Sequence, residues 1–149
     1  MSIREEDFKY MQIAEQVAEE MSTCQRGHTG SILVKKKEII LAAGDGTAGC
    51  IKSCAELKEC PARPKQYEER TGIRLRKCIC AERKLISLAA RDGIAIGGGT
   101  MYVTKKPCLT CAPSIIDAGI ERVIYDADNT DTMTSEMMKE ANIEFLQLK

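Results

Sequence analysis

Two short stretches of the sequence carry residue types that can bind a metal and move a proton. They are residues 78–83 (Cys-Ile-Cys-Ala-Glu-Arg) and residues 107–111 (Pro-Cys-Leu-Thr-Cys). The thiolates of Cys80, Cys108 and Cys111 would give a zinc ion three ligands and leave a fourth tetrahedral position open for water. Glu82 would then be a carboxylate beside the metal that is not itself a ligand. The pattern predicts a catalytic zinc site with Glu82 as acid and base.

The elements that position these residues can be predicted from the flanking sequence. Apolar residues recur at helical spacing from Leu85 to Ala89, and Gly93 follows as a stop signal, so Cys80 and Glu82 should lie in the first turn of a helix. Helix N-termini carry partial positive charge and unpaired N–H groups, which favour the thiolate form that zinc binds.

The second stretch is also predicted to begin a helix. Pro107 suits a helix start, which would place Cys108 and Cys111 three residues apart on the first turn, with Ile115 and Ile116 behind them. Both groups of cysteines would therefore lie at helix N-termini.

The remaining elements alternate between strands and helices. They are an amphipathic helix over about residues 3–21, an antiparallel hairpin over 31–42, strands at 100–104, 123–125 and 143–148, and a helix over 131–140 capped by Thr130 or Asp131. In the second half of the chain, strands alternate with helices along the sequence, and this order implies parallel strands with helices on both faces of the sheet.

Composition limits the class of protein. A chain of 149 residues has the length of one domain, and no apolar run approaches the roughly 20 residues that cross a bilayer. The start is charged and unlike a signal peptide, so we expect a cytoplasmic protein with no membrane partner. In that compartment the eight cysteines favour metal binding or reduced thiols over disulfides.

The charges balance at 22 basic and 22 acidic residues, so no global field attracts nucleic acid. Lysine and arginine nevertheless crowd residues 58–84. This run is either a solvated face or the rim of a pocket for a phosphorylated substrate.

The motifs and their surroundings resemble a known family. Cys80-Ala81-Glu82, followed by Pro107-Cys108-x-x-Cys111, is similar to the signature of the zinc-dependent cytidine deaminase superfamily. Residues 89–93, 99–104 and 118–125 extend the likeness to the deoxycytidylate deaminase branch over most of the chain. The resemblance implies an α/β fold, a three-layer α/β/α sandwich with a central mixed five-stranded sheet, as a single domain over residues 1–149 with a Cys-rich insert at about 50–78.

The resemblance also assigns roles to individual residues. Substrate contacts would come from the Ala81 backbone, from carbonyls between Thr104 and Lys106, and from Asp45, where the deoxycytidylate branch has an asparagine that touches the sugar. That branch also has a histidine at the position of Cys80. Arg83 matches an arginine that, in the nucleoside-deaminating branch, offsets the charge of three thiolates.

A second, structural zinc site is a further expectation from the resemblance. Some members of the branch hold such an ion, and the matching positions here are Cys24, Cys54 or Cys50, Cys60 and Cys78. A closed four-thiolate set is a familiar structural zinc arrangement. The alternative is that these cysteines are ordinary thiols, and His28 remains a spare candidate ligand.

The implied reaction is hydrolysis of a cytosine nucleotide, deoxycytidylate first, to the uracil nucleotide and ammonia, in a zinc-dependent homo-oligomer. Asp45 and Cys80 favour an alternative substrate: a nucleoside, a free base such as guanine, or another aminated heterocycle. Outside enzymes, the alternative is a zinc-held interaction module. Nucleic-acid editing is disfavoured because aromatic residues make up only 4% of the chain and strand binding uses aromatic platforms in a basic groove.

Overall fold

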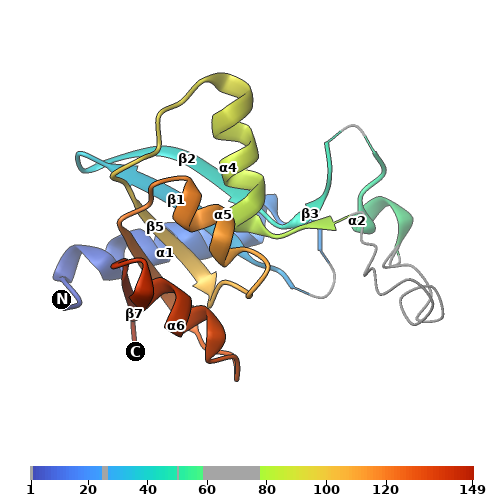
Figure 1. Ribbon diagram of the computed structural model, residues 1–149. Coiled ribbons are helices and arrows are strands. Elements are labelled where there is room, and N and C mark those ends of the chain that lie inside the picture. Colours follow the sequence, from blue (N-terminus) through green and yellow to red (C-terminus); the bar gives the residue numbers. More distant parts are fainter. Residues whose placement is uncertain (1, 25–26, 50, 59–77) are drawn as a thin grey trace.

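A mixed five-stranded sheet is the centre of the molecule (Figure 1). The computed structural model describes residues 2–24, 27–49, 51–58 and 78–149. The strand order is β2-β1-β5-β6-β7. Strand β1 runs antiparallel to both β2 and β5, whereas β5, β6 and β7 are parallel. The strands are β1 (Gly30–Lys35), β2 (Glu38–Gly44), β5 (Thr100–Lys105), β6 (Arg122–Ala127) and β7 (Glu144–Gln147).

Helices cover both faces of this sheet. Helix α1 (Glu5–Met21) packs on one face, and α4 (Ala81–Asp92), α5 (Ala112–Asp117) and α6 (Met133–Glu140) cover the other (Figure 1). Because successive strand residues point to opposite faces, Ile32 packs in the cluster beneath α1 and Leu33 in the cluster with α4 to α6. The predicted three-layer α/β/α architecture is confirmed.

The start of α4 agrees with the sequence prediction. Cys80 is the N-cap residue, Glu82 lies in the first turn, and the helix ends at Gly93, whose φ of 66° is the left-handed conformation that glycine adopts easily. The first ligand stretch thus enters its helix as expected.

The start of α5 differs from the prediction. The helix begins at Ala112, with a proline in its first turn, and not at Pro107. The backbone amides of Cys111 and Ala112 both donate to the carbonyl of Cys108, which closes a separate turn before the helix. The expectation that Cys108 lies in the first helical turn is wrong, because this turn precedes the helix and Cys111 is the N-cap residue.

Two small elements near the site were not predicted as such. Strand β3 (Gly46–Thr47) pairs antiparallel with β4 (Cys78–Ile79), so the segment that follows Asp45 is hydrogen-bonded to the segment that leads into Cys80. Helix α2 (Cys54–Leu57) begins the insert. Cys50 and Cys60 lie outside the described residues.

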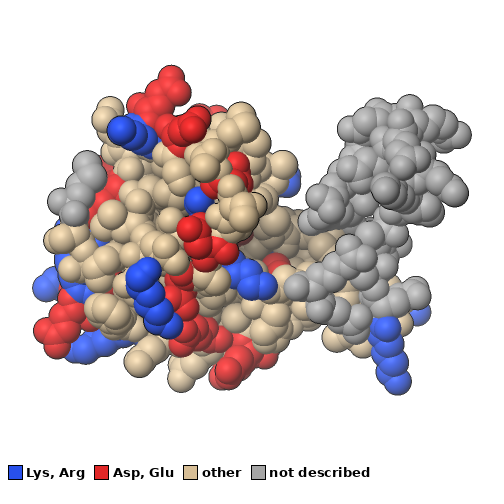
Figure 2. Space-filling model, turned by 90° about the horizontal axis from the view of Figure 1, so that it is seen from below, with Lys and Arg blue, Asp and Glu red and all other residues tan. Residues whose placement is uncertain are grey.

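The described surface carries charges of both signs. On the face shown in Figure 2, lysine and arginine alternate with aspartate and glutamate. Most of the basic run at residues 58–84 lies outside the described part of the chain. None of the helices in the described ranges has the length and apolarity that crossing a bilayer requires.

The β6–α6 connection and α6 agree closely with the sequence. Helix α6 begins at Met133, two residues later than predicted, and Thr132 is its N-cap residue. The carboxylate of Asp131, one residue before the N-cap, accepts hydrogen bonds from the amides of Met133 and Thr134, so this predicted residue satisfies the first amides of the helix. Strands β5 and β6 are parallel, so the carboxyl end of β6 lies beside that of β5, which the connection with Cys108 follows.

Candidate active site

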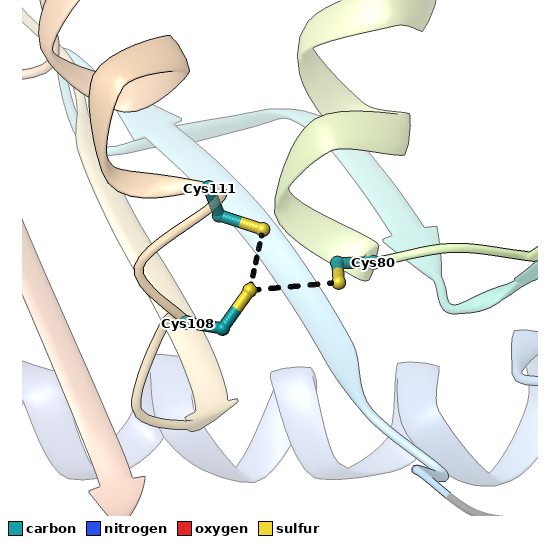
Figure 3. A group of neighbouring side chains, drawn as sticks. All are labelled: Cys80, Cys108 and Cys111. Carbon is teal, nitrogen blue, oxygen red and sulfur yellow. Dashed lines mark hydrogen bonds between the residues drawn. The ribbon is translucent and has the colours of Figure 1, made fainter. Parts of the chain in front are cut away.

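Three cysteine sulfurs converge between the N-terminus of α4 and the β5–α5 connection (Figure 3). The Sγ atoms of Cys80 and Cys108 are 3.9 Å apart, and those of Cys108 and Cys111 are 3.3 Å apart. All three lie within 4.8 Å of one another. Tetrahedral zinc with Zn–S bonds of about 2.3 Å needs sulfurs about 3.8 Å apart, so this set fits the ion.

Within the described ranges, no fourth histidine, cysteine or carboxylate belongs to this group. Three sulfurs would thus leave one tetrahedral position for a small molecule, as catalytic zinc sites do. A structural site would normally be closed by a fourth protein ligand.

The three thiols are coupled through their protons. Hydrogen bonds from Cys111 and Cys80 hold the pKa of Cys108 well below its usual range. The hydrogen bond to Cys108 raises the pKa of Cys80 and, likewise, that of Cys111. The three sulfurs thus share their protons through hydrogen bonds, and a divalent ion that bound them would displace these protons.

Glu82 is the buried carboxyl group beside these sulfurs. Glu82 is 4% exposed. Burial raises the pKa of its carboxyl group to about 7, and the charges of Cys108 and Asp45 make smaller contributions in the same direction. A carboxyl group with a pKa near neutrality can both accept and return a proton at physiological pH.

The first turn of α4 is held in place by contacts that sequence reasoning missed. The buried hydroxyl of Ser31 on β1 donates to the carbonyl of Ala81 at 3.0 Å. On the other side, Lys84 Nζ donates to the carbonyl of Thr47 at 3.1 Å. The only sequence signal was a hydroxyl residue within an otherwise apolar strand.

Asp45 lies close enough to Glu82 for its charge to raise the pKa of that carboxyl group. It is 7% exposed, and its Oδ1 accepts hydrogen bonds from Ser22 Oγ at 2.5 Å and from the Thr29 amide at 2.7 Å. Its other oxygen lies over Gly27, where an added Cβ would come within 2.2 Å of it. The carboxylate is thus fixed in orientation, and its charge acts on Glu82.

Two other predicted contact residues, Thr104 and Lys106, lie at the end of β5 and directly after it. Thr104 Oγ1 accepts a hydrogen bond from the Gly30 amide at 3.2 Å. Lys106 is buried, and its carbonyl accepts from the side-chain amide of Asn129 at 3.2 Å. Arg83 is exposed on α4, and across the described residues no hydrogen bond links its guanidinium to a sulfur.

Part of the second cysteine group is also close together. The sulfurs of Cys54 and Cys78 are 3.5 Å apart, and Cys54 is fully buried. Cys24 Sγ accepts a hydrogen bond from the Gly27 amide at 3.2 Å. His28 is exposed and has a φ of 48°.

Comparison with known proteins gives a family match over most of the chain. Residues 4–127 match the family model described as the cytidine and deoxycytidylate deaminase zinc-binding region. The deoxycytidylate deaminase of Mycobacterium phage D29 is 29% identical over 117 residues, which are 75% of this chain and 88% of that protein. The deoxycytidylate deaminase of Schizosaccharomyces pombe is 28% identical over 144 residues, 95% of this chain but 43% of that longer protein.

The fold also matches a solved structure. The dCMP deaminase from the cyanophage S-TIM5, crystallised with dCMP and dUMP, superimposes with a TM-score of 0.79 at 22% identity. The match covers 99% of this chain and 100% of that one.

Proposed function

Since this chain belongs to the cytidine and deoxycytidylate deaminase family and is a hydrolytic deaminase, we propose that it converts deoxycytidylate to the uracil nucleotide with release of ammonia. The observation that carries the proposal is the set of three sulfurs with an open fourth position beside the buried Glu82. The phage and yeast relatives bear the name of that activity, and the cyanophage enzyme was crystallised with dCMP.

Cys80, Cys108 and Cys111 would hold the zinc ion. Bound there, zinc supplies Lewis acidity that lowers the pKa of a water molecule toward about 7. Glu82 accepts the proton of that water and delivers it to N3 of the cytosine ring, which makes C4 electrophilic. Once water has added at C4, the same carboxylate takes the remaining proton of the added hydroxyl and passes it to the amine, which leaves as ammonia.

The surrounding residues would orient the ring and the sugar. We assign the pyrimidine to the Ala81 backbone and to the carbonyl groups from Thr104 to Lys106, and a sugar hydroxyl to Asp45. The Ser22 hydroxyl and the Thr29 amide both donate to Oδ1 of Asp45 and fix the orientation of the carboxylate that would meet the sugar. A carboxylate accepts but cannot donate, so it selects a hydroxyl donor.

The test is ammonia release from the zinc-loaded protein with deoxycytidylate, cytidylate, deoxycytidine, cytidine, guanine and single-stranded DNA. Turnover should be greatest with deoxycytidylate and absent in Glu82→Gln, which retains zinc. Full turnover in Glu82→Gln would remove Glu82 from the mechanism.

One observation favours a second candidate substrate. The carboxylate of Asp45 would repel a nearby phosphate, which favours a nucleoside or a free base over a nucleotide. The same substrate panel distinguishes the two candidates. A higher kcat/KM for deoxycytidine than for deoxycytidylate would identify the nucleoside, and not the nucleotide, as the preferred substrate.

We further propose a second, structural zinc held by Cys54 and Cys78, with Cys24 and Cys60 as the further ligands that the family resemblance indicates. Among the described residues, the Cys24 sulfur does not form a ligand group with those of Cys54 and Cys78. The 3.5 Å separation of the Cys54 and Cys78 sulfurs supports this second site, because two ligands of one zinc lie about that far apart. Cys54→Ser should lower the zinc content from two ions per chain to one. A wild-type content of one ion would contradict this second site.

The assembly is proposed to be a homo-oligomer, as the family resemblance implies. Light scattering on the zinc-loaded protein should give a mass that is a multiple of the 16.5 kDa chain. A monomer mass at micromolar concentration would contradict this part of the proposal.

A further inference from the structure

Lys106 occupies an unusual position directly before Pro107 and Cys108. Its side chain is 6% exposed. The ammonium nitrogen donates to the carbonyl of Asp131 at 2.7 Å and lies 3.2 Å from Oδ1 of Asp128. It also lies 5.9 Å from the centre of the Tyr125 ring. A buried lysine needs such partners, because an unpaired buried charge is strongly destabilising.

The backbone of the same residue is held by the same loop. The Lys106 amide donates to the carbonyl of Ala127 at 2.7 Å, and the Lys106 carbonyl accepts from Asn129 Nδ2 at 3.2 Å. One residue thus contacts the β6–α6 loop (residues 128–132) through its ammonium and its carbonyl, and the end of β6 through its amide.

These contacts continue into α6. Asn129 Oδ1 accepts from the Asp131 amide at 3.0 Å, and the carboxylate of Asp131 caps the helix through the amide of Met133 at 3.0 Å. Lys106 is therefore the point at which the loop, the cap of α6 and the cysteine-bearing connection meet.

The location gives this arrangement a consequence for the substrate. Strands β5 and β6 are parallel, so their carboxyl ends lie side by side. The β6–α6 loop and the connection that carries Cys108 both start from these carboxyl ends. In open α/β sheets, ligands bind outside the carboxyl ends of the strands. The ammonium is already committed to Asp131 and Asp128, so it is placed to hold a loop and not to bind a phosphate.

We propose that the β6–α6 loop forms one wall of the substrate site and that Lys106 is the positioning residue that holds this wall against the Cys108 connection. This inference rests on the proposed deaminase function, because the wall is assigned to its substrate. In this scheme the side chain of Lys106, which the substitution below alters, touches neither the sulfurs nor the substrate; the backbone carbonyl assigned to the pyrimidine is retained.

The test compares Lys106→Met and Asn129→Ala with a matched control, Lys35→Met. Lys35 Nζ also donates to a backbone carbonyl, that of Ala95 at 3.3 Å, but it extends from the last residue of β1, away from the cysteines. For each variant, KM and kcat for deoxycytidylate, zinc content, thermal midpoint and hydrogen exchange over residues 127–134 are measured.

Loss of a charged hydrogen bond that orders the wall should raise KM about tenfold in Lys106→Met and by a smaller factor in Asn129→Ala. The kcat and the zinc content should change by less than about twofold, because neither Glu82 nor a sulfur is altered. Exchange over residues 127–134 should be faster in both variants, and Lys35→Met should match the wild type.

A lower thermal midpoint with unchanged KM in both variants would show a purely structural role and overturn the inference. An equal rise of KM in Lys35→Met would overturn it as well. If Lys106→Met does not fold, Asn129→Ala decides by the same criterion. A wild-type protein that deaminates nothing in the substrate panel would contradict the proposed function instead.

Discussion

The guanidinium of Arg122 donates two hydrogen bonds, of 2.6 and 2.8 Å, to the buried carboxylate of Asp7. Asp7 lies in the first turn of α1 and Arg122 begins β6, so the pair joins residues 115 positions apart. Tyr102 donates to the same carboxylate at 2.7 Å, and Glu144 accepts from the guanidinium at 2.9 Å. This network fastens α1 to the sheet.

Removing one partner of this pair should be costly. Asp7→Ala leaves the Arg122 guanidinium largely buried without its carboxylate, and we expect the free energy of unfolding to fall by about 3–5 kcal/mol. Urea denaturation measures the change. Asp92→Ala, which removes an exposed partner of Arg91, is the control and should leave the denaturation midpoint unchanged. A loss for Asp7→Ala as small as in the control would contradict the assignment.

The same pair predicts a dependence of stability on pH. Burial raises the pKa of Asp7, but the hydrogen bonds from Arg122, the Arg4 amide and Tyr102 outweigh it and lower the pKa below its usual value. The folded protein therefore holds this proton less tightly than the unfolded chain, whose aspartate titrates near 3.9. The stabilisation is complete well above pH 4 and is lost as the pH falls through the folded pKa.

Stability measured between pH 6 and pH 3 should accordingly fall more steeply for the wild type than for Asp7→Asn, whose side chain does not titrate. Parallel curves for the two proteins would contradict this source of acid sensitivity.

Glu82 should show the opposite sign in the metal-free protein. Its folded pKa of about 7 exceeds the unfolded value of about 4.3, so the native state loses stability as the pH rises between these values. Metal-free Glu82→Gln should therefore become more stable than metal-free wild type as the pH rises from 5 to 8, by an amount on the order of 1–3 kcal/mol. Thermal unfolding after chelation measures it. A gap that does not grow with pH would contradict the burial effect.

Ser31 should matter through the turn that carries Glu82. Ser31→Ala removes the hydroxyl that donates to the Ala81 carbonyl, and we expect a loss of about 1 kcal/mol in unfolding free energy. The kcat should fall several-fold while zinc content stays constant, because the first turn of α4 loses a contact. Ser87→Ala, an exposed change on the same helix, is the control. An unchanged kcat in Ser31→Ala would show that Ser31 contributes to the stability of the fold and not to catalysis.

The charge of three thiolates must be offset, and two residues are candidates. Arg83 is the residue that the family resemblance indicates, but its side chain is exposed. Thr110 Oγ1 lies 2.9 Å from Cys108 Sγ, within hydrogen-bonding distance. A hydroxyl that donates to a thiolate favours the charged form, so Thr110→Val should release zinc at a higher pH, by up to about one pH unit.

Zinc release to a coloured chelator, followed as a function of pH, compares Thr110→Val with Arg83→Gln. Thr110→Ser keeps the hydroxyl and should behave as the wild type. A shift in Arg83→Gln with none in Thr110→Val would assign the compensating role to the arginine.

Much of the fold could be predicted because its signals are local. The helical period near Cys80, the alternation in the hairpin and the cap at Asp131 each depend on residues a few positions apart. The helix start at Pro107 was wrong because proline is compatible with both a helix start and a preceding turn. In the structure, the carbonyl of Cys108 accepts hydrogen bonds from the amides of Cys111 and Ala112, and these bonds form a turn before the helix.

From the sequence by itself, residue type and spacing predicted which atoms would do the chemistry, those of Cys80, Cys108, Cys111 and Glu82, because metal binding and proton transfer depend on side-chain type. Only the tertiary structure decided how these atoms are held. The pairing of β1 with β5 brings Ser31 to the Ala81 carbonyl, and the parallel ends of β5 and β6 bring Lys106 to Asp131. Such contacts join residues 25 or more positions apart, and no local pattern encodes a pairing over that distance.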